Sequence, residues 1–277
     1  MRILVTGATG HVGPELISQV LERGHAVRAI VRDGSNPPDL GEDVETFAGD
    51  LRDAETLRPA LVGVDGVFLL SGYDDDGLVR EMRAANVSRA ALLSSSAAPT
   101  GDLSNAVAAY HIRSERAMEQ SGIPVASLRP NSFMSNTLRW LPQIRLGSAI
   151  REPFADVAIA TNDPRDIAAV ATVALLADAP ESRAYRITGP EALRAAERVA
   201  ILSEALGRHL PFEPLSNDDA RKEMSANMPP EYVDAFFNFF VEGSIDETTV
   251  LPTVADVIGR PPRTFREWAK EHASEFG

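Results

Sequence analysis

The first half of the chain alternates short apolar runs with longer amphipathic stretches. The apolar runs have the length and β-branched content of buried strands, and we predict strands at 2–6, 26–31, 44–47, 66–71, 89–95 and 124–129. The stretches between them carry apolar residues at helical spacing, and we predict helices at 13–23, 53–61, 76–86 and 105–121. Strands and helices that alternate in this order are typical of βαβ units, so the pattern predicts a parallel sheet.

The pattern in the second half is less regular. We predict helices at 166–177 and 195–206, with Asp163 or Asp166 capping the first, and a strand at 185–188. The end of the chain, 254–277, is expected to be helical around Phe265 and Trp268, after a break at Pro261 and Pro262. A stretch rich in Met and Phe lies at 224–240, and no Gly- or Ser-rich linker divides the chain. We therefore predict an α/β fold, with a doubly wound Rossmann sheet in 1–130. A smaller α/β substrate-binding part follows in 131–277, and residues near 160–190 return to the sheet.

Composition narrows the class of protein. A hydrophobic content of 44% in 277 residues is enough for a sizeable ordered core. The absence of cysteine excludes disulfides, thiolate zinc sites and a cysteine nucleophile, and no His or carboxylate cluster has metal-ligand spacing. A net charge of −13 argues against direct binding of nucleic acid. Without a secretory signal or a membrane-length apolar run, we expect a cytoplasmic protein with no membrane partner.

The first strand runs into a glycine-rich loop that opens a helix. Residues 3–13 read I-L-V-T-G-A-T-G-H-V-G. Gly7 allows a tight turn, Gly10 lets backbone amides approach a pyrophosphate, and Gly13 permits close packing of the helix. The N-terminus of that helix then faces the phosphates with free N–H groups. We predict a dinucleotide-binding loop whose contacts come from Gly7, Thr9, Gly10, His11, Val12 and Gly13.

The end of the second strand bears on which dinucleotide is bound. NAD sites place an acidic residue here to hold the ribose 2′-hydroxyl, whereas an arginine accommodates a 2′-phosphate. The chain has Arg32 at this position, followed by Asp33. We expect Arg32 to bind the 2′-phosphate, so NADP(H) is favoured over NAD(H), although the neighbouring carboxylate points the other way.

These motifs, with several downstream segments, resemble one known family. The G-x-x-G-x-x-G spacing is similar to that of extended and atypical short-chain dehydrogenase/reductases. Segments 111–136, 185–193 and 257–265 are similar to hallmark segments of the NmrA-like members of that group, and the resemblance spans nearly the whole chain. It implies contacts of Asp50 and Leu51 with the adenine, and a cofactor path along the strand ends at Ser71, Ser94 and Pro130.

The same resemblance, with the residue types, suggests a substrate pocket. Asn131 is expected near the nicotinamide, because it follows the sixth strand. Aromatic and apolar residues downstream are candidates to wall a ring-sized site, with the Phe pairs near 236–240 as a cover. An aromatic stripe on a helix is also typical of a core, and this alternative applies to about half of them. The candidates are Asn131, Phe133, Met134, Trp140, Phe154 and Phe236.

The catalytic pair of short-chain reductases, Tyr-x-x-x-Lys, is absent. Aligning the fourth predicted helix through Glu115 places His111 at the Lys position and Val107 at the Tyr position. Tyr110 is rotated by roughly 100° on a helix, so it does not simply replace the missing Tyr. Because imidazole titrates near neutrality, we expect His111 to hold the nicotinamide ribose and supply a proton; the alternative is a packed helix residue. Ser95 is expected to donate to a substrate carbonyl, or else to cap its strand.

The resemblance leaves three functions open. The preferred one is an NADPH-dependent reductase of a cyclic or aromatic ketone, quinone or conjugated carbonyl, as in tailoring steps of secondary metabolism. The second is a non-catalytic NAD(P) redox sensor that regulates a partner protein. The third is an NAD(P)-assisted isomerase or cyclase. We expect a small aromatic or quinone-like substrate and a monomer or homodimer.

Overall fold

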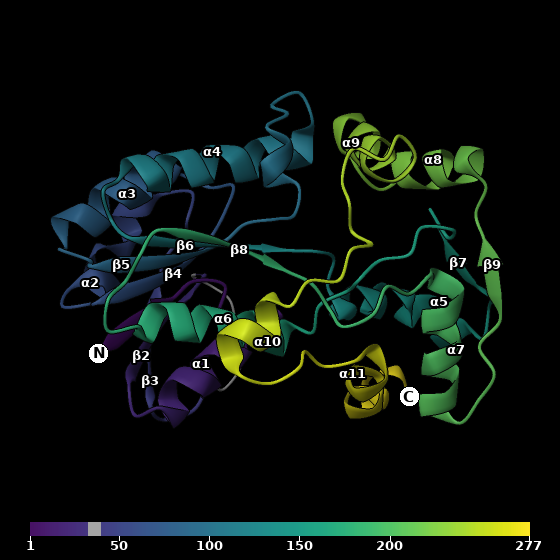
Figure 1. Cartoon of the computed structure of the whole chain (residues 1–277), viewed down its shortest axis with the longest axis horizontal. Helices are drawn as coiled ribbons and strands as arrows, with labels where there is room; N and C mark the ends of the chain where they lie inside the picture. The colour runs from purple at the N-terminus through teal and green to yellow at the C-terminus, as the bar shows by residue number, and fades with distance from the viewer. Residues whose placement is uncertain (33–39) are drawn as a thin grey trace.

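A seven-stranded parallel sheet forms the larger part of the molecule (Figure 1). The computed structural model describes residues 1–32 and 40–277, so Asp33 lies outside the described residues. The strands are β1 (Arg2–Val5), β2 (Ala26–Val31), β3 (Val44–Ala48), β4 (Gly66–Leu70), β5 (Arg89–Leu93), β6 (Val125–Pro130) and β8 (Arg183–Ile187). Every neighbouring pair in this sheet is parallel. The predicted α/β Rossmann fold is confirmed.

The strand order is β3-β2-β1-β4-β5-β6-β8. The order reverses between β1 and β4, because the chain builds outward from β1 in one direction and then from β4 in the other. At such a switch point the loops after neighbouring strands diverge and leave a crevice at their carboxyl ends. The candidate site is therefore expected beyond Val5, Leu70, Leu93 and Pro130.

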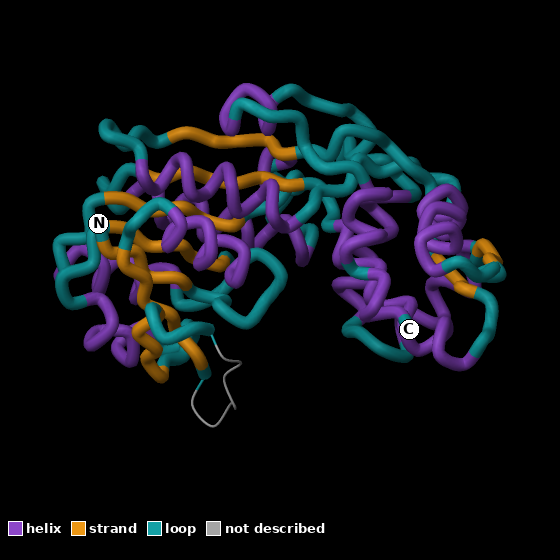
Figure 2. Tube along the Cα trace, turned by 90° about the horizontal axis from the view of Figure 1, so that it is seen from below, coloured by secondary structure: helices purple, strands orange, loops and turns teal. Residues whose placement is uncertain are grey.

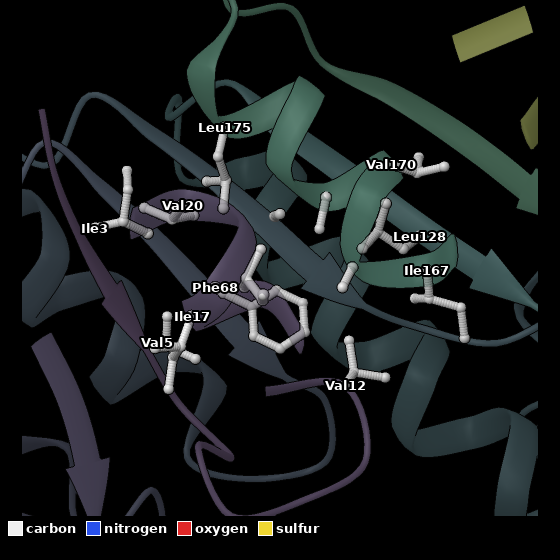
Figure 3. Packing of buried hydrophobic residues seen from close by; sticks show 14 of the residues in the cluster. Ile3, Val5, Val12, Ile17, Val20, Phe68, Leu128, Ile167, Val170 and Leu175 are labelled. Atoms are coloured by element: carbon white, nitrogen blue, oxygen red, sulfur yellow. The ribbon is translucent and has the colours of Figure 1, made fainter. Parts of the chain in front are cut away.

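Helices cover both faces of the sheet. One face is covered by α1 (Gly13–Glu22), α6 (Pro164–Leu176) and α10 (Thr253–Ile258). Figure 3 shows side chains of α1, α6 and the strands meeting in this layer. The other face is covered by η1 (Ala54–Leu57), α2 (Arg58–Leu61), α3 (Asp75–Ala84) and α4 (Ala106–Gln120). Alternating strand residues pack into the cores on the two faces of the sheet: Ile3 and Val5 on one face and Leu4 on the other.

The chain after residue 131 builds a second, smaller body beside the carboxyl edge of the sheet (Figure 2). Its elements are η3 (Met134–Trp140), α5 (Leu141–Leu146), β7 (Ile150–Glu152), α7 (Ala195–Leu206), β9 (Phe212–Pro214), α8 (Asn217–Ser225), α9 (Pro230–Phe240), α11 (Phe265–Glu271) and η4 (Ala273–Phe276). A separate core centred on the fully buried Trp140, Phe265 and Trp268 holds most of it together, whereas α8 and α9 pack in a cluster of their own. β7 and β9 form a small parallel sheet.

Some boundaries differ from expectation for local reasons. The segment 53–61 is a 3₁₀ turn followed by one α-helical turn, because Pro59 suits only the first turn of a helix. Asp53 precedes that turn, but its side chain makes no capping hydrogen bond. In 254–277 the predicted break at Pro261 and Pro262 is confirmed: it lies between α10 and α11, and Gly259 at φ +73° ends α10. Asp163 caps α6 by accepting from the Arg165 amide.

Residues near 160–190 contribute to the sheet layer. β8 pairs with β6, and α6 packs against α1 beneath the sheet. We propose a division near residue 131, with α6, β8 and α10 counted with the sheet. Across 1–32 and 40–277, no helix combines the length and the apolar character needed to cross a membrane.

Candidate functional site

The loop between β1 and α1 is shaped by its three glycines. Gly7 adopts φ +65°, a conformation that side chains disfavour, and its carbonyl accepts a hydrogen bond from the Gly10 amide at 3.0 Å. A Cβ on Gly13 would lie 2.2 Å from the Gly7 oxygen, so the start of α1 requires glycine there. A Cβ on Gly10 would meet the same oxygen at 3.3 Å. This turn aims the first amides of α1 into the crevice.

A first cleft of about 390 Å³ opens beside this loop. It is lined by Gly7, Thr9 and Gly10 together with the ends of β2 and β3, including Arg32, Asp50 and Leu51. Of the remaining predicted loop contacts, His11 has an exposed side chain and Val12 has its side chain in the core, so neither side chain lines the cleft. Any contribution of Val12 is therefore limited to its backbone.

Asp50 is held by a neighbour that the sequence did not single out. Arg52 donates to its carboxylate from Nη2 at 2.7 Å and from Nε at 3.1 Å, and the Arg52 amide donates as well. These bonds lower the pKa of Asp50 to about 2. The carboxylate is therefore charged, and part of its accepting capacity is used by Arg52. Contact of Asp50 with an adenine amino group remains a prediction.

Arg32 lines the same cleft, which motivates a test of cofactor choice. Arg32→Ala should weaken NADPH binding about tenfold, because one charge-assisted hydrogen bond at an exposed position lies at the lower end of the usual range of roughly 1.5–3 kcal/mol. NADH binding should change less than twofold, since it has no 2′-phosphate. Titrating both dinucleotides into the variant measures the difference, and equal losses for both would show that Arg32 does not read the phosphate.

A second cavity of about 360 Å³ lies beyond the ends of β4, β5 and β6. Leu70 and Tyr73 line both hollows, so the cleft and the cavity adjoin along one wall. α4 contributes Val107, Tyr110 and His111, and α9, which packs against α4, adds aromatic rings to the lining. An extended dinucleotide with its adenosine half in the cleft would bring its nicotinamide half to this cavity. The residues present therefore fit such a group.

His111 lies in this cavity and is held by Ser71. The Ser71 Oγ is 2.6 Å from Nδ1 of His111 and donates to the Leu93 carbonyl at 2.9 Å. Because a carbonyl only accepts, the single hydroxyl proton belongs to that bond, and Nδ1–H must donate to Ser71. Nε2 is then left as an acceptor. An acceptor at Nε2 matches the hydroxyl donors of a ribose. Ser71 acts on the site by fixing the orientation of the imidazole through Nδ1.

The expectation that His111 titrates near neutrality is wrong. Burial lowers the pKa of His111 to about 4, so the imidazole is neutral at pH 7. The expectation for Tyr110 also needs correction: its ring lies 4.2 Å from that of His111 and lines the same cavity. Burial raises the pKa of the Tyr110 phenol. Neither group is poised as a strong acid.

Two buried polar atoms at the cavity have no partner within the described chain. They are Ser94 Oγ and Asn131 Oδ1, both in residues at most 4% exposed. Buried polar atoms are nearly always hydrogen-bonded, so a bound molecule is the natural partner here. Ser95 also lines the cavity; its Oγ accepts from the Ala97 amide at 3.1 Å, which leaves its hydroxyl proton available. Pro130 forms part of the floor.

Sequence reasoning missed a buried carboxylate. Glu247, on the loop between α9 and α10, lines the cavity and is 6% exposed. It accepts from Ser96 Oγ at 2.8 Å, from Ser132 Oγ at 2.7 Å and from the Ser132 amide at 3.1 Å. Burial raises its pKa despite these donors. The three serines at 94–96 were a partial signal, but no local pattern marks an acid more than a hundred residues away.

The aromatic candidates divide into two groups. Phe133 and Phe236 line the cavity, together with Phe239 and Phe240 of α9. The expectation is wrong for three others, which lie outside the cavity lining. Met134 and Trp140 are fully buried in the core of the second body, where they pack with Phe265. Phe154 packs behind the aromatic wall, with its ring 5.1 Å from that of Phe237.

The NmrA-like family model matches residues 1–269. The chain belongs to this family. Over 99% of both chains it is 40% identical to (4-alkanoyl-5-oxo-2,5-dihydrofuran-3-yl)methyl phosphate reductase of Streptomyces griseus and 35% identical to NAD(P)H azoreductase of Xenophilus azovorans. The fold is similar to that of NADPH-dependent quinone oxidoreductase from Escherichia coli in complex with NADPH. For this pair the TM-score is 0.79 at 24% identity, over 97% of this chain and 99% of that chain.

Proposed function

We propose that this protein is an NADPH-dependent reductase that adds hydride to a cyclic conjugated carbonyl. The oxidoreductase class is confirmed, because the two relatives that are 40% and 35% identical over 99% of the chain are named reductases. The NADP cofactor is confirmed as well: one of those relatives is named for NAD(P)H, and the similar folds include complexes with NADPH and NADP(H). The class of substrate and the roles of the individual cavity residues are our proposal.

The observation that carries the proposal is the absence of a strong acid from the α4 side of the described cavity lining; Glu247, a carboxylate of the lining, is engaged by Ser96 and Ser132. Val107 occupies the position of the usual Tyr, His111 is neutral, and the phenol of Tyr110 is held protonated. Such a site suits substrates whose negative charge is delocalised after hydride addition. An azo group, a quinone and a 5-oxo-2,5-dihydrofuran, which the relatives' names describe, all share this property. A simple ketone does not, since its alkoxide needs a proton at once.

The loop of Gly7, Thr9 and Gly10 would hold NADPH, which would supply a hydride for the β-carbon of the conjugated system, so that negative charge would develop on the carbonyl oxygen. The free hydroxyl protons of Ser94 and Ser95 are placed to donate to that oxygen and stabilise the developing charge. A proton from solvent then completes the reduction at the α-carbon. The rings of Phe236, Phe239 and Phe240 wall the apolar side of the cavity and keep bulk water from it.

The substrate's size follows from the cavity. A volume of about 360 Å³ suits one ring with a modest substituent beside a nicotinamide. The 40% identical relative is named for a substrate that also carries a methyl phosphate. The described lining of the cavity includes no lysine or arginine. The cavity therefore accounts for a ring, and a phosphate would need cations from outside this lining.

A panel of acceptors tests the proposal by NADPH oxidation. We expect steady turnover with a 4-acyl-5-oxo-2,5-dihydrofuran, a naphthoquinone or an azo dye, and turnover at least about 100-fold slower with cyclohexanone, whose reduction needs an acid catalyst. Cyclohexanone reduced as fast as the quinone would contradict the absence of a strong acid. Tight binding of NADPH and NADP⁺ with no turnover on any acceptor would favour a redox sensor.

A further inference from the structure

Arg198 is a buried cation without an acceptor. It lies on the inner face of α7 and is 4% exposed. Within residues 1–32 and 40–277, no atom accepts a hydrogen bond from its guanidinium, and its Nε is fully enclosed. The guanidinium carbon lies 5.7 Å from the centre of the Trp140 ring, which offers a cation–π contact and no hydrogen bond. A buried charge without a hydrogen-bonded partner destabilises a fold, so its retention calls for a ligand.

A second guanidinium lies on the neighbouring element. Arg139 of η3 pairs with Glu152, a buried carboxylate that also accepts from Trp140 Nε1 at 2.8 Å. Half of the Arg139 side chain is open to solvent, yet desolvation and the positive charge of Arg198 lower its pKa to about 10. Among the described residues, Glu152 is the one carboxylate that is hydrogen-bonded to either of these two guanidinium groups.

This cationic pair adjoins the substrate cavity. Asn136 lines the cavity and precedes Arg139 by one turn of the 3₁₀ helix η3, so the two side chains lie along one face. Glu247, which also lines the cavity, is close enough to Arg198 to raise its pKa, although burial outweighs it and lowers the value to about 10. Ser135, which precedes Asn136 on η3, has a buried Oγ without a partner among the described residues. The polar end of the cavity thus leads to Arg198 and Arg139.

We propose that Arg198, with Arg139, binds a phosphate group carried by the substrate. This inference rests on the proposed function, since the ring must occupy the cavity for its substituent to reach η3. A phosphate monoester offers three acceptor oxygens and close to two negative charges at pH 7, which matches paired guanidinium groups. Glu247 lies on the ring side and would repel the phosphate if ionised, so the phosphate is held on the η3 side.

The test compares a phosphorylated dihydrofuranone with the same compound carrying a free hydroxymethyl group. Calorimetry is done with NADP⁺ at saturation, so that the 2′-phosphate site at Arg32 is already filled. The wild-type protein should bind the phosphorylated compound more tightly than the alcohol. Arg198→Met should weaken the phosphorylated compound by about 10–100-fold and leave the alcohol within twofold, while Arg198→Lys should retain an intermediate affinity.

A stability measurement separates this role from a structural one. Because methionine removes a buried charge without an acceptor, Arg198→Met should unfold at the same temperature as the wild type or higher without ligand. The phosphorylated compound should raise that temperature for the wild type and much less for the variant. Arg116→Met, at an exposed position on α4, controls for the loss of one charge.

The outcomes distinguish this inference from the proposed function. Equal affinity of the wild type for both compounds would overturn the phosphate site, and so would an Arg198→Met variant that melts earlier and keeps the wild-type preference. A preference for the phosphorylated compound without any NADPH oxidation would support the anion site and contradict the reductase proposal. Turnover of the alcohol with wild-type efficiency in Arg198→Met is the expected result if both hold.

Discussion

Gly10→Val should bind NADPH at least about 100-fold more weakly than the wild type while remaining folded. The branched side chain fills the space into which the loop amides and the N-terminus of α1 must receive the pyrophosphate. The protein itself tolerates the change, because a Cβ at this position meets the Gly7 carbonyl at 3.3 Å, a tight contact that a small shift relieves. Calorimetry with NADPH, beside a thermal melt, measures both expectations.

Gly13→Ala is the matched control for that experiment. Its Cβ would lie 2.2 Å from the Gly7 oxygen and 2.8 Å from the Ala8 Cα, where nothing flexible can yield. This variant should therefore lose folding stability first, and any loss of binding would follow from that. The two variants thus distinguish Gly10, which we expect NADPH binding to require, from Gly13, which we expect folding to require. An unchanged NADPH affinity in folded Gly10→Val would refute the loop assignment.

His111→Ala should lower kcat/KM on the order of 100-fold, the size of loss expected when a reacting group is misplaced by about 1 Å. We assign the effect to positioning: Nε2 accepts from the nicotinamide ribose, and Ser71 fixes the ring through Nδ1. His111→Gln keeps an acceptor near the Nε2 position and should recover most of the activity. Arg113→Ala, on the exposed face of the same helix, should behave as wild type.

The pH dependence distinguishes this role from acid catalysis. With a pKa near 4, His111 stays neutral from pH 8 to 5.5, so His111 should cause no change in kcat/KM over that range. An inflection near pH 6.5 that disappears in His111→Gln would instead restore the acid role. The effect of His111 on the free energy of unfolding depends on pH in a definite direction, because the unfolded chain takes up this proton near pH 6.5, before the folded chain does. The contribution of His111 to folding stability is therefore fully present above pH 6.5 and is lost as the pH falls towards 4.

The sheet and the glycine-rich turn after β1 were predictable because each is determined by residues that are close together in the sequence. Each strand needs only its own apolar run, and the Gly7 turn needs only its neighbours in sequence. The second body was harder, since η3, β7 and β9 are too short to impose a period. Met134 and Trp140 show a different limit. An apolar side chain beside a cavity and one inside a core have the same sequence signal, and only packing separates them.

The polar part of the site was the least predictable. A loop brings Glu247 to the cavity, and Arg198 lies on the outlying helix α7 and not in the cavity lining, so no spacing relates either residue to His111. The register of α4 correctly placed His111 among the cavity residues, but burial then changed its protonation. A pKa depends on how much water the fold removes, and this quantity is absent from a single sequence.

The last 25 residues have a consequence for how this enzyme can change over evolution. Val254 of α10 is buried in the core under the sheet, whereas Phe265, Trp268 and Phe276 fill the core of the second body. α6 and β8 likewise return to the sheet between segments that belong to the second body. No single crossover point therefore exchanges the substrate-binding part as a module. New substrates are reached by replacing individual wall residues, such as those of α9, within one jointly packed chain.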